Sequence, residues 1–161
     1  MIREAVVFGL LNSALISVLI LLSFKHEPRL WLHHFPEQMQ ALVPAKTAAE
    51  KRLERRWGVP IIGCMIVLPL AVAMWRHQTH GFTYLDAYLF LWIATQTFNL
   101  MDLLVLDWLV TVRWSPPWMQ LQGAESMKRY DNYWFHFVGF LKGLLIGSVG
   151  AAVIALPFLW L

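Results

Sequence analysis

Residues 95–114 read TQTFNLMDLLVLDWLVTVRW, and they set the central question of this chain. The stretch continues an apolar run and, together with it, predicts one membrane-spanning helix at residues 84–112. Yet it carries the carboxylates of Asp102 and Asp107 and the amide of Asn99. Ionisable groups inside a lipid bilayer are costly, so each one predicts a functional site or a partner of opposite charge.

The composition places the whole chain in a membrane. Of its 161 residues 58% are hydrophobic and only 14% are charged, which is too little charge to coat a soluble domain. Nine Trp and ten Phe fit a lipid-facing surface with aromatic rings at both interfaces. The basic residues flank apolar runs instead of forming a separate stripe, which argues against nucleic-acid binding. Cys64 is the one cysteine, so an internal disulfide is excluded.

Four apolar runs are long enough to cross a bilayer, because about 20 helical residues span a hydrocarbon core of ~30 Å. The predicted spans are residues 5–24, 58–75, 84–112 and 133–160. A polar segment, residues 25–57, lies between the first two and is expected to rest on the headgroup layer. The predicted fold class is therefore all-α: a polytopic membrane protein forming a four-transmembrane-helix bundle with one interfacial, amphipathic segment. Residues 1–161 form a single membrane domain.

Local signals inside this pattern predict particular contacts. Thr47 and Glu50 form a capping box that starts a helix leading into the second span. Pro69 lies in the middle of that span, where it predicts a kink and an unpaired carbonyl near residue 65. Asn12 lies near the middle of the first span, and its simplest role is a hydrogen bond to another helix.

The distribution of Lys and Arg predicts the orientation. Residues 25–57 carry seven and residues 113–134 carry three, whereas the opposite side holds only Arg3 and Arg76. This bias of ten against two places residues 25–57 and 113–134 in the cytoplasm, so both termini lie outside. We therefore expect an N-out, C-out integral protein of a cell membrane. Its assignment to a bacterial cytoplasmic membrane is a guess from the small size of the chain.

The fourth span carries candidate partners for the two carboxylates. Counted inward from the cytoplasmic surface at ~1.5 Å per residue, Asp102 and Lys142 share a depth of about 15–17 Å. Asp107 and His136 share a depth of about 6–9 Å by the same count. On an ideal α-helix, however, Asp102 and Asp107 point about 140° apart, so both pairs cannot lie on one narrow seam.

Three interpretations of this cluster stay open. The charges could pair only to fix helix register. They could line a cavity that handles protons, as in a transporter subunit, or that binds a lipid-like or small ligand. One acid could instead contact a partner membrane protein or a second copy of the chain. That interface would use the closely spaced small residues of the fourth span, Gly139, Gly143 and Gly147. The predicted cavity is lined by Asn99, Asp102, Asp107, His136 and Lys142.

The interfacial segment adds an enzymatic alternative. The segment of residues 26–37 carries His26, Arg29, His33 and His34. If this segment covers the cavity as a lid, a histidine could act as a base while Arg29 holds the phosphate of a lipid-like substrate. Adjacent His33 and His34 lack the spacing of paired metal ligands, so no metal site is predicted. No motif in the sequence identifies a reaction or a cofactor.

Overall fold

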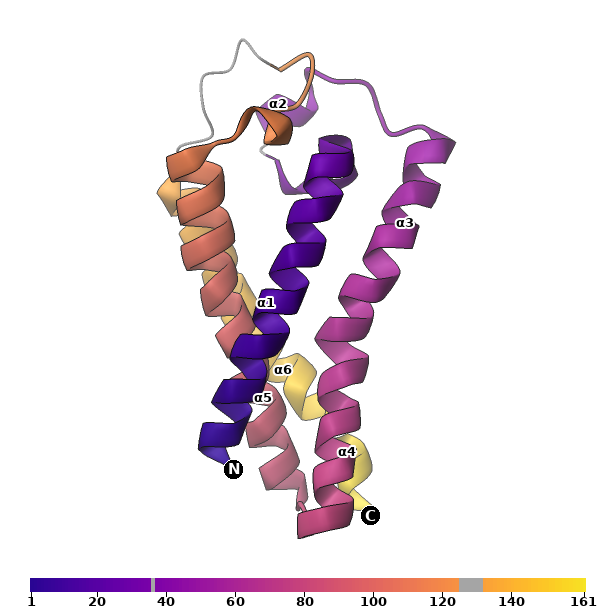
Figure 1. Ribbon diagram of the computed structural model, residues 1–161, viewed down its shortest axis with the longest axis vertical. Helices are drawn as coiled ribbons and strands as arrows, with labels where there is room; N and C mark the ends of the chain where they lie inside the picture. The colour runs from indigo at the N-terminus through magenta and orange to yellow at the C-terminus, as the bar shows by residue number, and fades with distance from the viewer. Residues whose placement is uncertain (36, 125–131) are drawn as a thin grey trace.

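The computed structural model describes residues 1–35, 37–124 and 132–161, and every element in these ranges is helical (Figure 1). Four helices are long and apolar enough to cross a membrane. They are α1 (Ile2–His26), the continuous α3 (Ala48–Ile62), η2 (Gly63–Val67) and α4 (Leu68–His80), then α5 (Tyr84–Met101) with η3 (Asp102–Trp114), and α6 (Tyr133–Ile154). Short helices connect them: η1 (Pro28–His34), α2 (Glu37–Gln40), η4 (Pro117–Met119) and η5 (Leu156–Leu159). The all-α class and the four candidate spans are confirmed.

The second long helix begins at Ala48, as the capping box predicted, and continues to His80, beyond the predicted end of the span at residue 75. Its start is fixed by the predicted capping box, in which Thr47 Oγ1 accepts from the Glu50 amide at 3.2 Å and Glu50 accepts from the Thr47 amide at 2.6 Å. The fourth helix ends at Ile154, shortly before Pro157, which cannot continue an α-helix.

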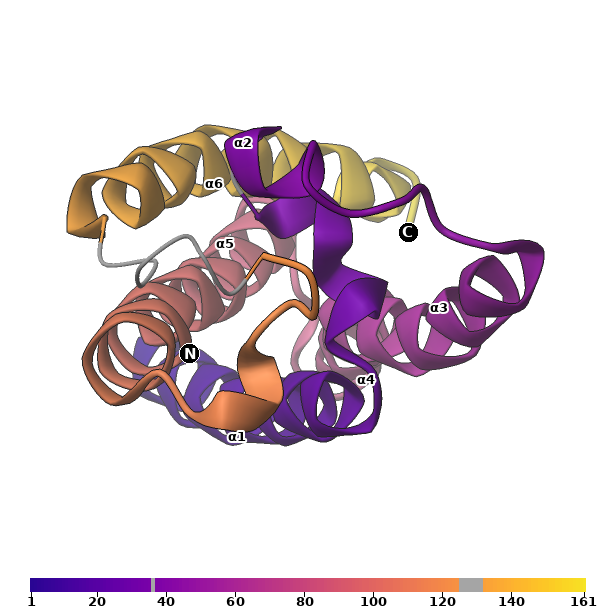
Figure 2. The same ribbon diagram turned by 90° about the horizontal axis from the view of Figure 1, so that it is seen from above.

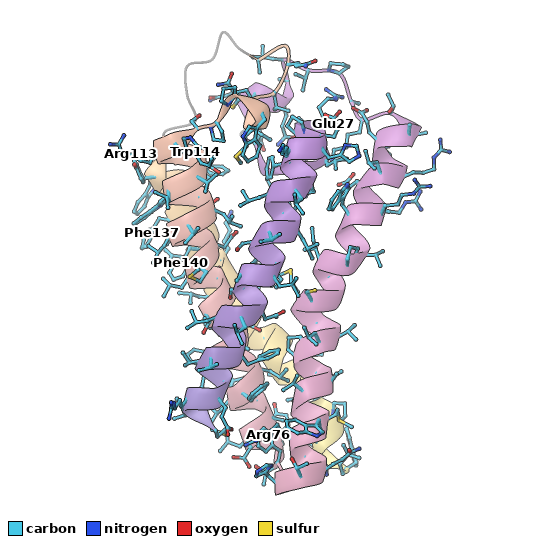
Figure 3. All side chains as sticks on the ribbon, in the orientation of Figure 1. Glu27, Arg76, Arg113, Trp114, Phe137 and Phe140 are labelled. Carbon is cyan, nitrogen blue, oxygen red and sulfur yellow. The ribbon has the colours of Figure 1, made fainter. Side chains whose placement is uncertain are left out.

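The long helices converge at the end that holds both termini and spread apart toward the opposite end (Figure 1). Small buried residues at the narrow end, including Ala5, Ala73 and Ala151, let the helices approach closely. Figure 3 places Arg76 at this end, where its guanidinium pairs with Glu4 of α1 at 2.6 Å. Packing is therefore dense near the termini and opens toward the loops.

Polar side chains of α5 hold α6 along one seam. Their donors meet α6 acceptors at four-residue steps: Tyr84 Oη to Ala152 O, Trp92 Nε1 to Ser148 Oγ, Gln96 Nε2 to Leu144 O and Asn99 Nδ2 to Phe140 O. A Cβ at Gly143 would overlap the Asn99 amide, and one at Gly147 would come within 2.9 Å of Gln96 Nε2. The small residues of the fourth span thus permit a close contact inside the chain. Their role toward a partner protein stays a prediction.

The carbonyl that Pro69 was predicted to leave unpaired and the interhelical hydrogen bond predicted for Asn12 belong to one contact, between Asn12 and Cys64. In η2 the backbone bonds run from residue i to residue i−5, as the Leu68 amide shows by donating to the Gly63 carbonyl. In that register the next donor, for the Cys64 carbonyl, would be Pro69, which has no N–H. Asn12 Nδ2 of α1 donates to the Cys64 carbonyl instead, at 2.9 Å. A side chain of the first helix therefore satisfies the carbonyl that proline leaves unpaired.

The half of the third helix that carries the carboxylates is also a π-helix. η3 runs from Asp102 to Trp114 with bonds to residue i−5, and the Ser115 amide ends it by donating to Val110 at 2.7 Å. In this winding, residues five apart lie nearly one above the other, whereas an α-helix turns them well apart. Asp102 and Asp107 therefore share one face. The prediction that they point about 140° apart is wrong, because it assumed α-helical winding.

Candidate functional site

A cavity of about 1000 Å³ fills the space between the diverging helices. Its walls come from α1, α3, η2, α5, η3 and α6. Most of the wall is apolar, with Ile20, Phe98 and Leu106 among the lining residues. Volumes of this size are typical of sites that enclose a small molecule.

The segment between the first two long helices closes the cavity at its wide end. We call η1 and α2 together the lid. Seen from above, the lid crosses over the space that the helices enclose (Figure 2). Leu30, Trp31 and Met39 of the lid line the cavity directly. The segment thus folds over the cavity, which was the arrangement that the enzymatic alternative required.

Specific contacts fasten the lid to the helices. The Trp31 ring stacks on Phe24 of α1 with centroids 5.3 Å apart, and its Nε1 donates to Ser23 Oγ at 2.8 Å. Lys46 follows the lid and pairs with Glu54 of α3 at 2.9 Å. Its Nζ also donates to the Leu30 carbonyl at 2.5 Å. These bonds hold the lid closed in the structure.

All five residues predicted to line a cavity do line this one: Asn99, Asp102, Asp107, His136 and Lys142. They come from three elements, α5, η3 and α6. The amide of Asn99 is used in the seam with α6, so it is part of the packing as well as of the wall. The structure thus brings the five residues to one cavity, and their role in binding a ligand stays a prediction.

Asp107 and His136 meet as their depths predicted. His136 Nδ1 lies 2.9 Å from Asp107 Oδ1, and the histidine is buried. A carboxylate that accepts from Nδ1 fixes the orientation and the tautomer of the ring. This arrangement is suited to positioning the imidazole beside the cavity.

The second predicted pair is not formed. Within the described part of the chain, no ion pair or hydrogen bond joins Asp102 to Lys142, or either residue to another side chain. Asp102 is half-buried and Lys142 is exposed, and both face the same cavity. Equal depth along two helices places two charges at one height, but it does not determine how far apart they lie across the cavity.

Two of the four predicted lid residues line the cavity. His33 and His34 do so, with ring centroids 4.1 Å apart, and His33 Nδ1 lies 3.6 Å from Glu54 Oε1. Desolvation, followed by the charge of His33, lowers the pKa of His34 to about 4 against the pull of Asp107. His34 of the lid and the half-buried carboxylate of Asp107 line the same cavity.

The other two residues of the predicted segment, Arg29 of η1 and His26 at the end of α1, lie outside the cavity lining. Arg29 donates to Glu50 of α3 and to the Pro44 carbonyl, so its guanidinium anchors the chain that follows the lid. The His26 ring packs against Trp57 with centroids 6.1 Å apart. In this arrangement neither residue faces a molecule held in the cavity.

The sequence reasoning missed the contribution of α3. Glu54 and Arg55 line the cavity, although their segment was used only to predict the orientation, and Gly58 at the predicted start of the second span lines it too. A helical wheel contains the missing clue, because 54, 58, 61 and 65 lie at steps of four and three residues and so share a face. Ile61 and Met65 of that set also line the cavity.

The cavity has an apolar flank between α3–η2 and α6. α6 packs against α5 and η3, and in the described chain no comparable packing joins it to α3 or η2. Val59 and Ile62 on one side and Ile146 on the other line the cavity while 70%, 55% and 70% of their surface stays exposed. The cavity is therefore open sideways, at a height where a membrane would place lipid chains.

Among the described residues, no three His, Cys, Asp or Glu side chains gather so as to hold a metal ion. The arrangement offers instead a histidine–carboxylate pair, two unpaired opposite charges and two lid histidines around one space. Comparison of the chain with protein-family models, with curated proteins and with solved structures finds no match.

Proposed function

We propose that this protein is an integral membrane protein that binds a lipid-like molecule in the cavity beneath the lid. The observation that carries the proposal is the cavity of about 1000 Å³, which combines apolar walls with Asp102, Asp107, His136 and Lys142. An amphiphile matches both kinds of surface, because its head needs polar partners and its chain needs apolar contact. The polar head would lie among these four residues.

The sideways opening supports a ligand that comes from the bilayer. Lipid chains cannot cross the headgroup layer easily, whereas an opening between α3 and α6 faces them directly. Val59, Ile62 and Ile146 would contact the part of the ligand's hydrocarbon chain that stays outside the cavity. The lid would keep water from the bound molecule at the wide end of the cavity.

Cavity-filling substitutions test this proposal. Gly139 lines the cavity and Gly150 does not, and in both cases a new Cβ meets nothing within 4 Å. Trp31 and Trp57 line the cavity, so a brominated amphiphile bound there should quench their fluorescence. We expect saturable quenching in detergent-solubilised protein and in Gly150→Phe, and affinity at least tenfold weaker in Gly139→Phe. Equal binding by the two variants would contradict the proposed site.

A second candidate function is an enzyme that acts on such a lipid. The observation that favours it is that the Asp107–His136 pair and His34 line the same cavity. An imidazole oriented by a carboxylate is a common general base. Mass spectrometry of the lipid recovered after incubation distinguishes the two functions, because a binder returns it unchanged.

A further inference from the structure

Asp102 and Lys142 point to the chemical class of the ligand, an inference that rests on the proposed binding function. Both side chains line the cavity, on η3 and α6 respectively. Within the described chain, neither has an ion pair or a hydrogen bond to another residue. The cavity therefore presents one acid and one base, in addition to the Asp107–His136 pair, that the protein itself leaves unmatched.

Unmatched charges at this depth are expensive. Lys142 is the tenth residue of the 22 in α6, so it lies about 15 Å from the start of that helix, near the middle of a bilayer. A charge in such a place needs a partner of opposite sign or water. Both side chains line the cavity, so a partner inside the cavity would reach them.

We propose that the bound molecule is a zwitterionic amphiphile whose amine pairs with Asp102 and whose phosphate or carboxylate pairs with Lys142. A purely anionic head would satisfy Lys142 and place a further negative charge on the wall that holds both Asp102 and Asp107. A purely cationic head would leave Lys142 unmatched. Asp107 already has His136 as its partner at 2.9 Å, so it does not compete for the amine.

A matrix of head groups and variants tests the assignment. The probes are lysophosphatidylethanolamine, a fatty acid and an alkylamine with brominated chains of equal length, measured by tryptophan quenching. The zwitterion should bind native protein most tightly, by about tenfold or more, because each ion pair adds a charge-assisted bond. In Asp102→Asn the zwitterion should no longer bind more tightly than the fatty acid. In Lys142→Met it should no longer bind more tightly than the alkylamine. Lys51→Met, on the exposed side of α3 and outside the cavity lining, should change neither ratio.

The possible outcomes separate this inference from the proposal beneath it. If no probe binds, the binding function itself is wrong. If all three bind equally in every variant, the cavity holds amphiphiles but the head-group assignment is overturned. The assignment also fails if each single substitution destabilises ligand-free protein and the double variant regains stability. That result would mean that the two side chains pair directly with each other.

Discussion

At Pro69 the second long helix lacks an amide hydrogen, and a side chain of another helix supplies the missing hydrogen-bond donor. The Asn12 amide lies 2.9 Å from the Cys64 carbonyl, which the π-helical register of η2 would otherwise leave unpaired. An unpaired carbonyl is costly where no water reaches it. Asn12 is therefore a structural residue that pairs with the backbone carbonyl of Cys64.

We predict that Asn12→Leu lowers the free energy of unfolding by about 0.5–2 kcal/mol, the range for a buried interhelical hydrogen bond. The loss should shrink in a Pro69→Ala background, because alanine restores the backbone donor that the Cys64 carbonyl lacks. Titration with dodecyl sulfate in mixed micelles measures both values. If Asn12→Leu lowers the free energy of unfolding equally in both backgrounds, the bond does not compensate for the donor that Pro69 lacks.

Single residues also show how far reasoning from sequence can reach. Depth along two antiparallel helices predicted that Asp107 meets His136, and the structure places their atoms 2.9 Å apart. The same count failed for Asp102 and Lys142, which share a height but face each other across an open space. Height follows from the rise per residue, whereas the width of a cavity depends on the angle between helices. No residue in the sequence sets that angle by itself.

At the scale of helices, winding decides which residues face the cavity. The wide turn of η3 brings Asp102 and Asp107 onto one face, although an α-helical wheel separates them. No proline or glycine interrupts this stretch, so no residue in it predicted the change of winding. The start of α3 shows the opposite case, because the Thr47–Glu50 capping box was visible beforehand and lies where it was expected.

The seam between α5 and α6 leads to a prediction about glycine. Gly143→Ala must displace the Asn99 amide and so break its bond to the Phe140 carbonyl. We expect a loss of about 1–2 kcal/mol in the free energy of unfolding. Gly150→Ala, where the new methyl meets nothing within 4 Å, should be neutral or stabilising by up to about 1 kcal/mol. Equal effects of the two substitutions would mean that α6 does not lie against Asn99.

The lid leads to a prediction about pH. Burial lowers the pKa of His34 from 6.5 to about 4, so the closed lid binds a proton less readily than an opened one. Between these two values an opened lid is protonated first, and acid therefore favours opening. Above pH 6.5 both forms are neutral and the closed lid keeps its full stability. His33 shifts in the same direction, because burial and Lys46 outweigh Glu54.

Hydrogen exchange of η1, corrected for the intrinsic rate at each pH, measures this opening. Exchange should be faster at pH 5 than at pH 7.5, and His34→Gln should reduce the difference because the side chain no longer titrates. His80→Gln serves as the matched control, since His80 ends α4 at the far end of the molecule. An unchanged pH dependence in His34→Gln would rule out this histidine as the cause.

At the scale of the whole molecule, the tight packing at one end explains the cavity at the other. Alanines such as Ala5, Ala73 and Ala151 let the helices meet near the termini, while α3 and α6 separate toward the lid. Composition alone predicted four apolar helices, because the lipid-facing surface must be apolar along the full length of each one. It could not predict the cavity, since wall residues such as Phe98 and Leu106 have the same character as ordinary core residues.

The orientation of the molecule is the last prediction. Figure 1 places both termini and the α4–α5 turn at one end, and Figure 3 places Arg113 at the other. Two of the cations used for the orientation, Lys128 and Arg129, lie outside the described residues. The seven Lys and Arg of residues 25–57 still outnumber those near the termini, so the lid should face the cytoplasm.

Single cysteines can test this in intact cells. Gln78, near the turn, and Gln122, beside the lid, are both exposed, and each can be replaced by cysteine in a Cys64→Ser background. A membrane-impermeant maleimide should label Gln78→Cys directly and Gln122→Cys only after the cells are permeabilised. The reverse pattern would place the lid outside. The positive-inside bias would then be misleading for this chain, and a bound molecule would be covered from the opposite side of the membrane.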